Sequence, residues 1–194
     1  MERKILLGVT GSVAAVLAAK LIKGLQELGE VRVVFTDSGK YFVDHDIKAQ
    51  QAFHAIAGSL DFYTDEDEWT NIYAVGDPIK HIELRKWADV LVLAPLSANT
   101  LAKVTHGICD NLLTSVVRAW DDSKPVVVAP SMNTMMWDND ITKKQINDLV
   151  VRRWTVVDPV EKTLACGDTG VGAMAPISSI VNGVKYALTC SDAF

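Results

Sequence analysis

The chain has 194 residues, of which 49% are hydrophobic and 22% are charged, and its formal net charge at pH 7 is −5. This length predicts one domain spanning residues 1–194. The acidic balance argues against a protein that coats nucleic acid or an anionic membrane. The cysteines Cys109, Cys166 and Cys190 have no repeating spacing, so we expect no disulfide framework and a reduced, cytoplasmic protein.

The N-terminal residues have the outline of a secretory signal peptide, since Met1–Lys4 precede the uncharged run Ile5–Ala19. Glycines and a turn interrupt that run, which favours a buried strand at Lys4–Val9 and a helix from Ala14 to about Leu28. Elsewhere the longest uncharged stretch is shorter than the roughly 20 residues of a membrane span. No transmembrane helix is expected.

Apolar strands alternate with amphipathic helices along the rest of the chain. The acidic segment Tyr63–Trp69 interrupts this alternation and is predicted to be a solvated loop. The alternation predicts a doubly wound, parallel α/β sheet of the Rossmann or flavodoxin-like kind, in three layers. The remaining predicted elements are a strand at Val31–Phe35, a helix around Ile47–Ala57, a strand at Val90–Ala94, a helix at Asp110–Trp120, a strand at Val126–Ala129, a helix at Ile141–Val150, a strand at Trp154–Val157 and a helix at Ile177–Leu188.

Ligands of such sheets bind at the carboxyl ends of the strands, so the loops that follow the strands are the candidate sites. Gly11 and Ser12 follow the first strand, where a tight turn and a helix N-terminus can hold a phosphate; an ordinary helix cap looks the same. No dinucleotide fingerprint and no P-loop is present. Asp37, after the second strand, could still hold a ribose hydroxyl, so a dinucleotide oxidoreductase stays an alternative. The third strand is followed by short polar side chains from Ser97 to Thr100.

The later loops carry rarer residue types. Three methionines surround Asn133, and the glycine-rich stretch Leu164–Gly172 is predicted to be a mobile flap that carries Cys166. We expect a chemical role for Cys166, whereas Cys109 and Cys190 are predicted to lie on helices and to serve packing. Metal binding is not expected, because no His, Cys or carboxylate pair has ligand spacing.

Together these motifs resemble the homo-oligomeric flavin-containing cysteine decarboxylases, and within them the phosphopantothenoylcysteine decarboxylase and halotolerance-protein branch. The likeness covers nearly the whole chain. It is carried by Gly11–Ala14, Ser97–Thr100, Pro130–Trp137 and Ala165–Asp168, and extends to Tyr63–Trp69 and His81–Asp89.

This resemblance implies an FMN enzyme, commonly a homotrimer with sites at subunit interfaces, that decarboxylates the small molecule 4′-phosphopantothenoylcysteine to 4′-phosphopantetheine for coenzyme A. Flavin would oxidise the thiol to a thioaldehyde, CO2 would leave, and the enethiolate would be protonated and reduced. The implied catalytic residues are His81, as base or orienting donor, and Cys166, as the acid. The implied substrate residues are Asn133, Met136, Lys86 and Ala165, and the implied FMN residues are Gly11, Ser12, Val13, Thr36, Ser38, Ser97, Ala98, Asn99, Thr100 and Ser131.

Two positions depart from the pattern of the family. Leu17 stands where relatives carry a lysine, and Lys86 stands where most carry an arginine. An ammonium lacks the bidentate geometry of a guanidinium toward carboxylate or phosphate, so these changes bear on substrate affinity. A peptidyl-cysteine decarboxylase, or a phosphatase-binding regulatory protein without activity, remain the alternatives.

Overall fold

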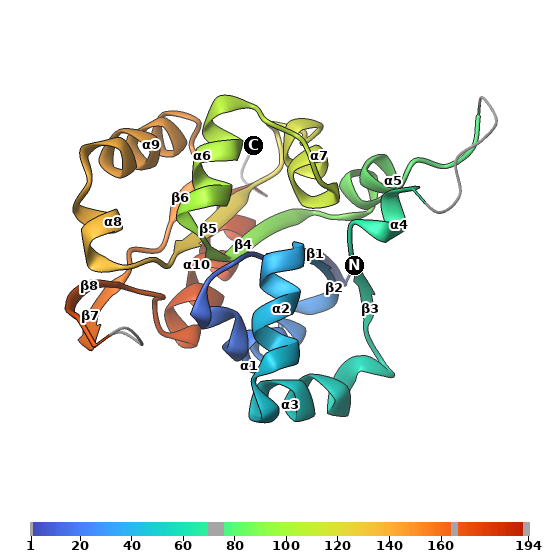
Figure 1. The fold of residues 1–194 in the computed structure, drawn as a ribbon. Coiled ribbons are helices and arrows are strands. Elements are labelled where there is room, and N and C mark those ends of the chain that lie inside the picture. Colours follow the sequence, from blue (N-terminus) through green and yellow to red (C-terminus); the bar gives the residue numbers. More distant parts are fainter. Residues whose placement is uncertain (1, 70–75, 164–166, 192–194) are drawn as a thin grey trace.

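The computed structural model describes residues 2–69, 76–163 and 167–191. Its main sheet has six parallel strands in the order β3-β2-β1-β4-β5-β6 (Figure 1). From β1 the chain winds outward to β3, and β4 returns to the other side of β1, so the winding reverses between β1 and β4. The bounds are β1 Arg3–Val9, β2 Gly29–Phe35, β3 Asp61–Tyr63, β4 Val90–Leu96, β5 Val126–Pro130 and β6 Thr155–Val156.

Side chains of the central strands alternate between two separate apolar cores, one on each face of the sheet. On β4, Val90 and Val92 belong to the first core, whereas Leu91 and Leu93 belong to the second. All seven residues of β4 are buried, as expected for a parallel strand covered on both faces. The doubly wound α/β prediction is confirmed.

Helices cover both faces. In Figure 1, α1 and α3 lie below the sheet and α6, α7 and α9 above it. The first core packs against α1, α2, α3 and α10, and the second against α5, α6, α7 and α9. The helical bounds are η1 (a 3₁₀-helix) Val13–Leu17, α1 Ala18–Gln26, α2 Asp37–His45, α3 Ile47–Ala57, α4 Glu66–Trp69, α5 Lys80–Trp87, α6 Ala98–His106, α7 Leu112–Arg118, α8 Thr134–Asp138, α9 Asp140–Val151 and α10 Ile177–Ser191.

The acidic segment was expected to be a solvated loop, and this is wrong. Its C-terminal part forms α4, where Glu68 is only 6% exposed. The hydroxyl and backbone N–H of Thr64 donate to Asp67. The backbone N–H of Leu112 donates to Asp65 at 2.9 Å, so the segment is tied to the start of α7. Glu68 is the one buried carboxylate of the described segment, and the N-termini of α5 and α7 supply donors to Glu68 and Asp65.

The described end of the glycine-rich stretch, Gly167–Gly172, leads into β8 (Thr169–Ala173), which pairs with β7 (Val160–Thr163) in a two-stranded antiparallel ribbon separate from the main sheet. The ribbon packs on the loop after β5, because the Met132 N–H donates to the Gly172 carbonyl at 2.9 Å. A Cβ on Gly172 would approach the Met132 carbonyl oxygen to 2.3 Å. This glycine is therefore required for close packing.

Two cysteine predictions also need correction. Cys109 lies in the connection between α6 and α7 rather than on a helix, and it is exposed. Cys190 lies on α10, as predicted, but it too is exposed and does not serve packing. Among the described residues, no helix is long and apolar enough to cross a membrane.

Candidate active site

Two adjoining cavities open at the carboxyl ends of the strands, where the winding reverses. The smaller has a volume of about 240 Å³ and the larger about 620 Å³. They share Gly11, from the loop after β1, and Ser97 and Asn99, from the start of α6. The position agrees with the rule that ligands of doubly wound sheets bind at the switch point.

The small cavity is polar. Thr36 caps α2 by accepting from the Gly39 N–H at 3.2 Å, and Ser97 caps α6 by accepting from the Thr100 N–H at 3.3 Å. The positive ends of two nine-residue helices therefore meet here. The other lining residues are Gly11, Asp37, Ser38, Asp65, Asn99, Lys103, Asp110 and Asn111.

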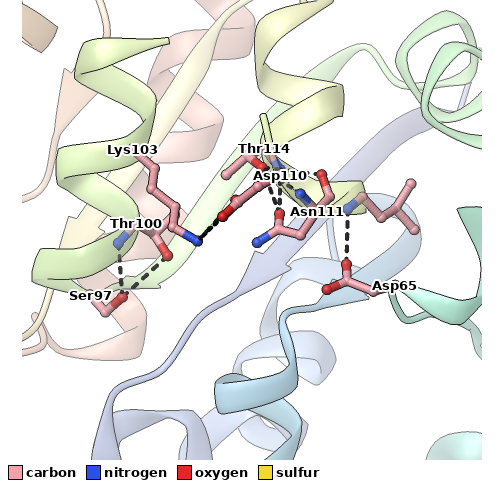
Figure 2. A network of polar contacts seen from close by, with 8 residues as sticks. Asp65, Ser97, Thr100, Lys103, Asp110, Asn111 and Thr114 are labelled. Carbon is pink, nitrogen blue, oxygen red and sulfur yellow. Dashed lines mark hydrogen bonds and ion pairs between the residues drawn. The ribbon is translucent and has the colours of Figure 1, made fainter. Parts of the chain in front are cut away.

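Two of the three acidic residues in this cavity have polar partners. Figure 2 shows Lys103, on α6, reaching Asp110, with its Nζ 2.8 Å and 2.9 Å from the two carboxylate oxygens. This hydrogen bond lowers the pKa of Asp110. Asp65 accepts from the N-terminus of α7, but burial, followed by the charges of Asp37 and Asp110, raises its pKa.

The large cleft is mainly apolar. Three loops of the main sheet and the β7–β8 ribbon supply its walls. Among the described residues lining it, Lys162 is the only charged one. The lining residues are Gly11, Ser12, Val13, Ala14, Val16, Leu17, Phe42, Ser97, Ala98, Asn99, Ser131, Met132, Asn133, Met136, Lys162, Thr163, Gly172, Ala173 and Met174.

All the residues assigned to FMN by resemblance line one or both cavities. Gly11, Ser97 and Asn99 line both; Ser12, Val13, Ala98 and Ser131 line the large cleft; Thr36, Ser38 and Thr100 line the small one. Across the large cleft, the Ser12 hydroxyl donates to the Ser131 hydroxyl at 3.0 Å, so the loops after β1 and β5 are joined.

Asn133 lies in the large cleft with a fixed side chain. Its amide oxygen accepts from the Met135 N–H at 2.8 Å, which caps α8, and its amide nitrogen donates to Asp168 at 2.7 Å. Because one partner is a donor and the other a carboxylate, the orientation of the amide is determined. Met136, which the resemblance also assigns to the substrate, lies in this cleft too.

His81 and Lys86 are placed elsewhere. Both lie on α5, and neither is among the described residues that line the two cavities. His81 is 24% exposed at its side chain and pairs with the buried Glu68, whereas Lys86 is exposed. The remaining predicted residues, Ala165 and Cys166, lie outside the described part of the chain.

Sequence reasoning missed Thr10, the buried residue that joins the two strands at the switch point. Its hydroxyl donates to the Pro95 carbonyl at 2.7 Å and accepts from the Ser97 N–H at 2.8 Å. It also missed Glu68, Lys162 and Asp168. Of these, Glu68 and Asp168 lie within segments that carry the resemblance, Tyr63–Trp69 and Ala165–Asp168.

A family model described as Flavoprotein matches residues 1–189. The chain belongs to the flavoprotein family. Its fold and its cavities agree with that family, whose shared ligand is a flavin.

This flavoprotein is 47% identical to a phosphopantothenoylcysteine decarboxylase of Oryza sativa subsp. japonica, over 95% of this chain and 80% of the relative. It is similar to a solved cysteine-to-serine mutant of PPC decarboxylase complexed with pantothenoylaminoethenethiol, at 47% identity and a TM-score of 0.87, covering 96% and 98% of the two chains. It is also similar to the FMN-binding protein AtHal3, at 47% identity and a TM-score of 0.85, covering 96% of each chain. These findings confirm the family that the motifs predict.

A further similarity, to the peptidyl-cysteine decarboxylase EpiD, is lower in identity. It has 26% identity and a TM-score of 0.74, and covers 95% of this flavoprotein and 99% of EpiD. The fold is therefore shared by relatives with different named substrates, and residues in the cleft must distinguish between those substrates.

Proposed function

We propose that FMN binds across the two cavities, with its phosphate end in the small one and its ring in the large one. Two helix N-termini and several hydroxyls in the small cavity suit an anion. The apolar cleft beside it suits a flat ring system. Gly11, at the junction, leaves no room for a side chain, since a Cβ there would lie 2.5 Å from the Ser38 Cβ.

We further propose that the protein decarboxylates 4′-phosphopantothenoylcysteine in the cytoplasm, as a step toward coenzyme A. The observation that carries this proposal is the fixed amide of Asn133 in the same cleft as the predicted flavin residues Ser12 and Ser131. The decarboxylases named above, at 47% identity, support it.

When bound, FMN supplies a reversible two-electron oxidation that turns the substrate thiol into a thioaldehyde, so that the electrons left by CO2 are delocalised onto sulfur. Asn133 orients the carboxylate that leaves, and the apolar wall around Met136 excludes water. Cys166 donates a proton to the enethiolate carbon. An ordinary thiol, with a pKa of about 8.5, is mostly protonated at neutral pH and can do this.

The similar cysteine-to-serine mutant supports this order of steps, because the compound named in its complex is an ethenethiol. We expect the Cys166→Ser variant to oxidise and decarboxylate the substrate but to release an enethiol and leave reduced FMN. Cys109→Ser is the matched control, since Cys109 is an exposed free thiol that lines neither cavity. Normal turnover by Cys166→Ser would show that Cys166 is not the acid.

The position of His81 supports a site shared between subunits. His81 lies outside the described lining of the cleft that holds Asn133, and we infer that a second copy brings its α5 to that cleft. We therefore propose a homotrimer with its sites at subunit interfaces. Mixing two inactive variants, His81→Asn and Asn133→Ala, would restore activity in mixed oligomers, whereas a site within one chain would give no recovery.

The central test is direct. The purified protein is incubated with 4′-phosphopantothenoylcysteine, the released CO2 is measured, and the bound pigment is identified after denaturation. FMN and stoichiometric CO2 are expected. No CO2 release would overturn the decarboxylase proposal, and release from cysteine-terminated peptides alone would favour a peptidyl-cysteine decarboxylase, the activity named for EpiD.

A further inference from the structure

Glu68 is the least exposed acidic side chain in the described part of the chain, and it faces His81. One carboxylate oxygen, Oε2, accepts from the backbone N–H of His81 at 3.1 Å. The other, Oε1, forms a short hydrogen bond with the ring Nδ1. The carboxylate therefore holds the backbone and the ring of the same residue.

The backbone contact has a structural purpose. Helix α5 begins after Ile79, whose side chain provides no cap, so the first N–H groups of the helix need another acceptor. Glu68 supplies it from a different helix, and the positive end of α5 stabilises the negative charge on the carboxylate. The contact to Nδ1 is not needed for this cap.

The ring contact determines where His81 carries its proton. An ionised carboxylate can only accept hydrogen bonds, so Nδ1 must be the protonated nitrogen. In the neutral ring Nε2 is then an acceptor, and the carboxylate stabilises the imidazolium that forms when Nε2 takes a proton. His81 is thus prepared to accept a proton at Nε2.

We propose that Glu68 is a positioning residue for decarboxylation, acting through His81. This inference rests on the proposed function. When the thiol is oxidised to C=S, Nε2 of His81 would accept its S–H proton, and bound FMN would supply the two-electron oxidation. With the other tautomer, Nε2 would carry a hydrogen and could not accept that proton.

Hydrogen bonds of the neighbouring residues hold the helix that carries Glu68 in place. Asp67, the preceding residue, accepts from the Thr64 N–H at 2.7 Å, and Asp65 is tied to α7. These contacts fix the turn at the start of α4, and the hydrogen bond from the His81 N–H holds the Glu68 carboxylate against α5.

Glu68→Gln separates the positioning role from the structural one. The glutamine oxygen can still accept from the His81 backbone N–H, but its NH2 group then donates to Nδ1, which forces the proton to Nε2. We expect an Nε2–H tautomer in ¹⁵N NMR of the FMN-loaded protein, against Nδ1–H in the wild type. We also expect kcat to fall about 100-fold or more, with KM and FMN content little changed.

Asp67→Asn is the matched control, because it removes the same charge from the preceding residue, does not touch His81, and keeps an oxygen that can accept from the Thr64 N–H. It should keep the Nδ1–H tautomer and a kcat within about threefold of the wild type.

The two proposals fail in distinguishable ways. An unchanged Nδ1–H tautomer or an unchanged kcat in Glu68→Gln would overturn the role of Glu68. Absence of CO2 release by the wild type would overturn the proposed function, while the tautomer measurement would still test whether Glu68 sets the proton on His81.

Discussion

The hydroxyl of Thr10 accepts a hydrogen bond from the backbone N–H of Ser97 at 2.8 Å, and so joins the end of β1 to the start of α6. The same hydroxyl donates to the Pro95 carbonyl at 2.7 Å, and Thr10 is fully buried. The contact crosses the point where the winding of the sheet reverses. The Thr10 side chain therefore helps to set the spacing between the two walls of the proposed flavin site, together with the hydrogen bond from the Thr10 backbone N–H to the Pro95 carbonyl at 3.3 Å.

Replacing Thr10 by Val should lower both stability and FMN affinity. Valine has the same shape, but it leaves the buried Ser97 N–H and one bond of the Pro95 carbonyl without a partner, which costs about 2–3 kcal/mol. Urea unfolding and fluorescence titration with FMN measure the two effects. We expect FMN affinity to fall about tenfold as the Ser97 loop shifts.

Two other variants separate this effect from the mere loss of a hydroxyl. Thr10→Ser keeps both hydrogen bonds and should bind FMN almost normally. Thr105→Val removes a hydroxyl whose hydrogen bonds, to the Leu101 and Ala102 carbonyls and the His106 ring, all lie within its own helix, and it should change stability by less than about 1 kcal/mol. Equal effects of Thr10→Val and Thr105→Val would contradict the proposed role of Thr10.

Gly11→Ala should prevent tight FMN binding. The new Cβ would lie 2.5 Å from the Ser38 Cβ, so the loops after β1 and β2 would have to separate at the junction of the two cavities. Such overpacking costs about 1–3 kcal/mol, and we expect a loss of FMN affinity of about tenfold or more, measured by equilibrium dialysis. Gly58→Ala is the control, since nothing lies within 4 Å of a Cβ there; if both variants bound FMN alike, the crowding at Gly11 would be irrelevant.

The sheet could be predicted from the sequence because its strands are strongly apolar. Runs such as Val90–Ala94 are apolar at every position, which is typical of a central parallel strand, and the structure buries them on both faces of the sheet. Helix α2 was missed. Its residues Asp37–His45 are short of apolar side chains, and only a few of them, such as Val43, contact the core. The three-residue strand β3 has no buried residue to reveal it.

The site was predictable where it depends on loops after strands, and not where it depends on contacts between distant segments. Gly11 and Ser97 follow strands, so topology alone brings them together. Glu68 lies in a run of acidic residues that looks solvated, and its burial depends on a helix that begins at Lys80. No local pattern reports such a pairing.

Asp65→Asn should stabilise the protein at neutral pH. Burial, followed by the charges of Asp37 and Asp110, raises the pKa of Asp65, so its ionised form is disfavoured in the folded state. The amide oxygen of asparagine can still accept from the Leu112 N–H. Because the group is partly exposed, we expect a gain in Tm of at most about 3 °C at pH 7.

The pH dependence of this gain has a defined sign. A carboxyl group with a raised pKa in the folded state lowers stability above that pKa and has no such effect below its unfolded value. The gain from Asp65→Asn should therefore shrink as the pH falls through the raised pKa and vanish below the ordinary value. In Asp121→Asn, where hydrogen bonds from Ser123 lower the pKa of the native carboxyl group, Tm should not rise; a rise in both variants would point to a general charge effect.

Lys162→Met should weaken the binding of the phosphorylated substrate. Lys162 is the only charged side chain among the described residues lining the large cleft, where Leu17 offers no charge. An exposed lysine interacting with a phosphate is worth about 1 kcal/mol, so KM should rise about threefold to tenfold, with kcat little changed. Steady-state CO2 release is measured with 4′-phosphopantothenoylcysteine and with its dephosphorylated form. If Lys162 binds the phosphate, KM should rise only for the phosphorylated substrate, and the rise should be smaller at high salt. Lys23→Met, on the exposed face of α1, is the control for net charge, and an equal rise in KM for both substrates would assign Lys162 to the carboxylate or the pantothenoyl arm instead.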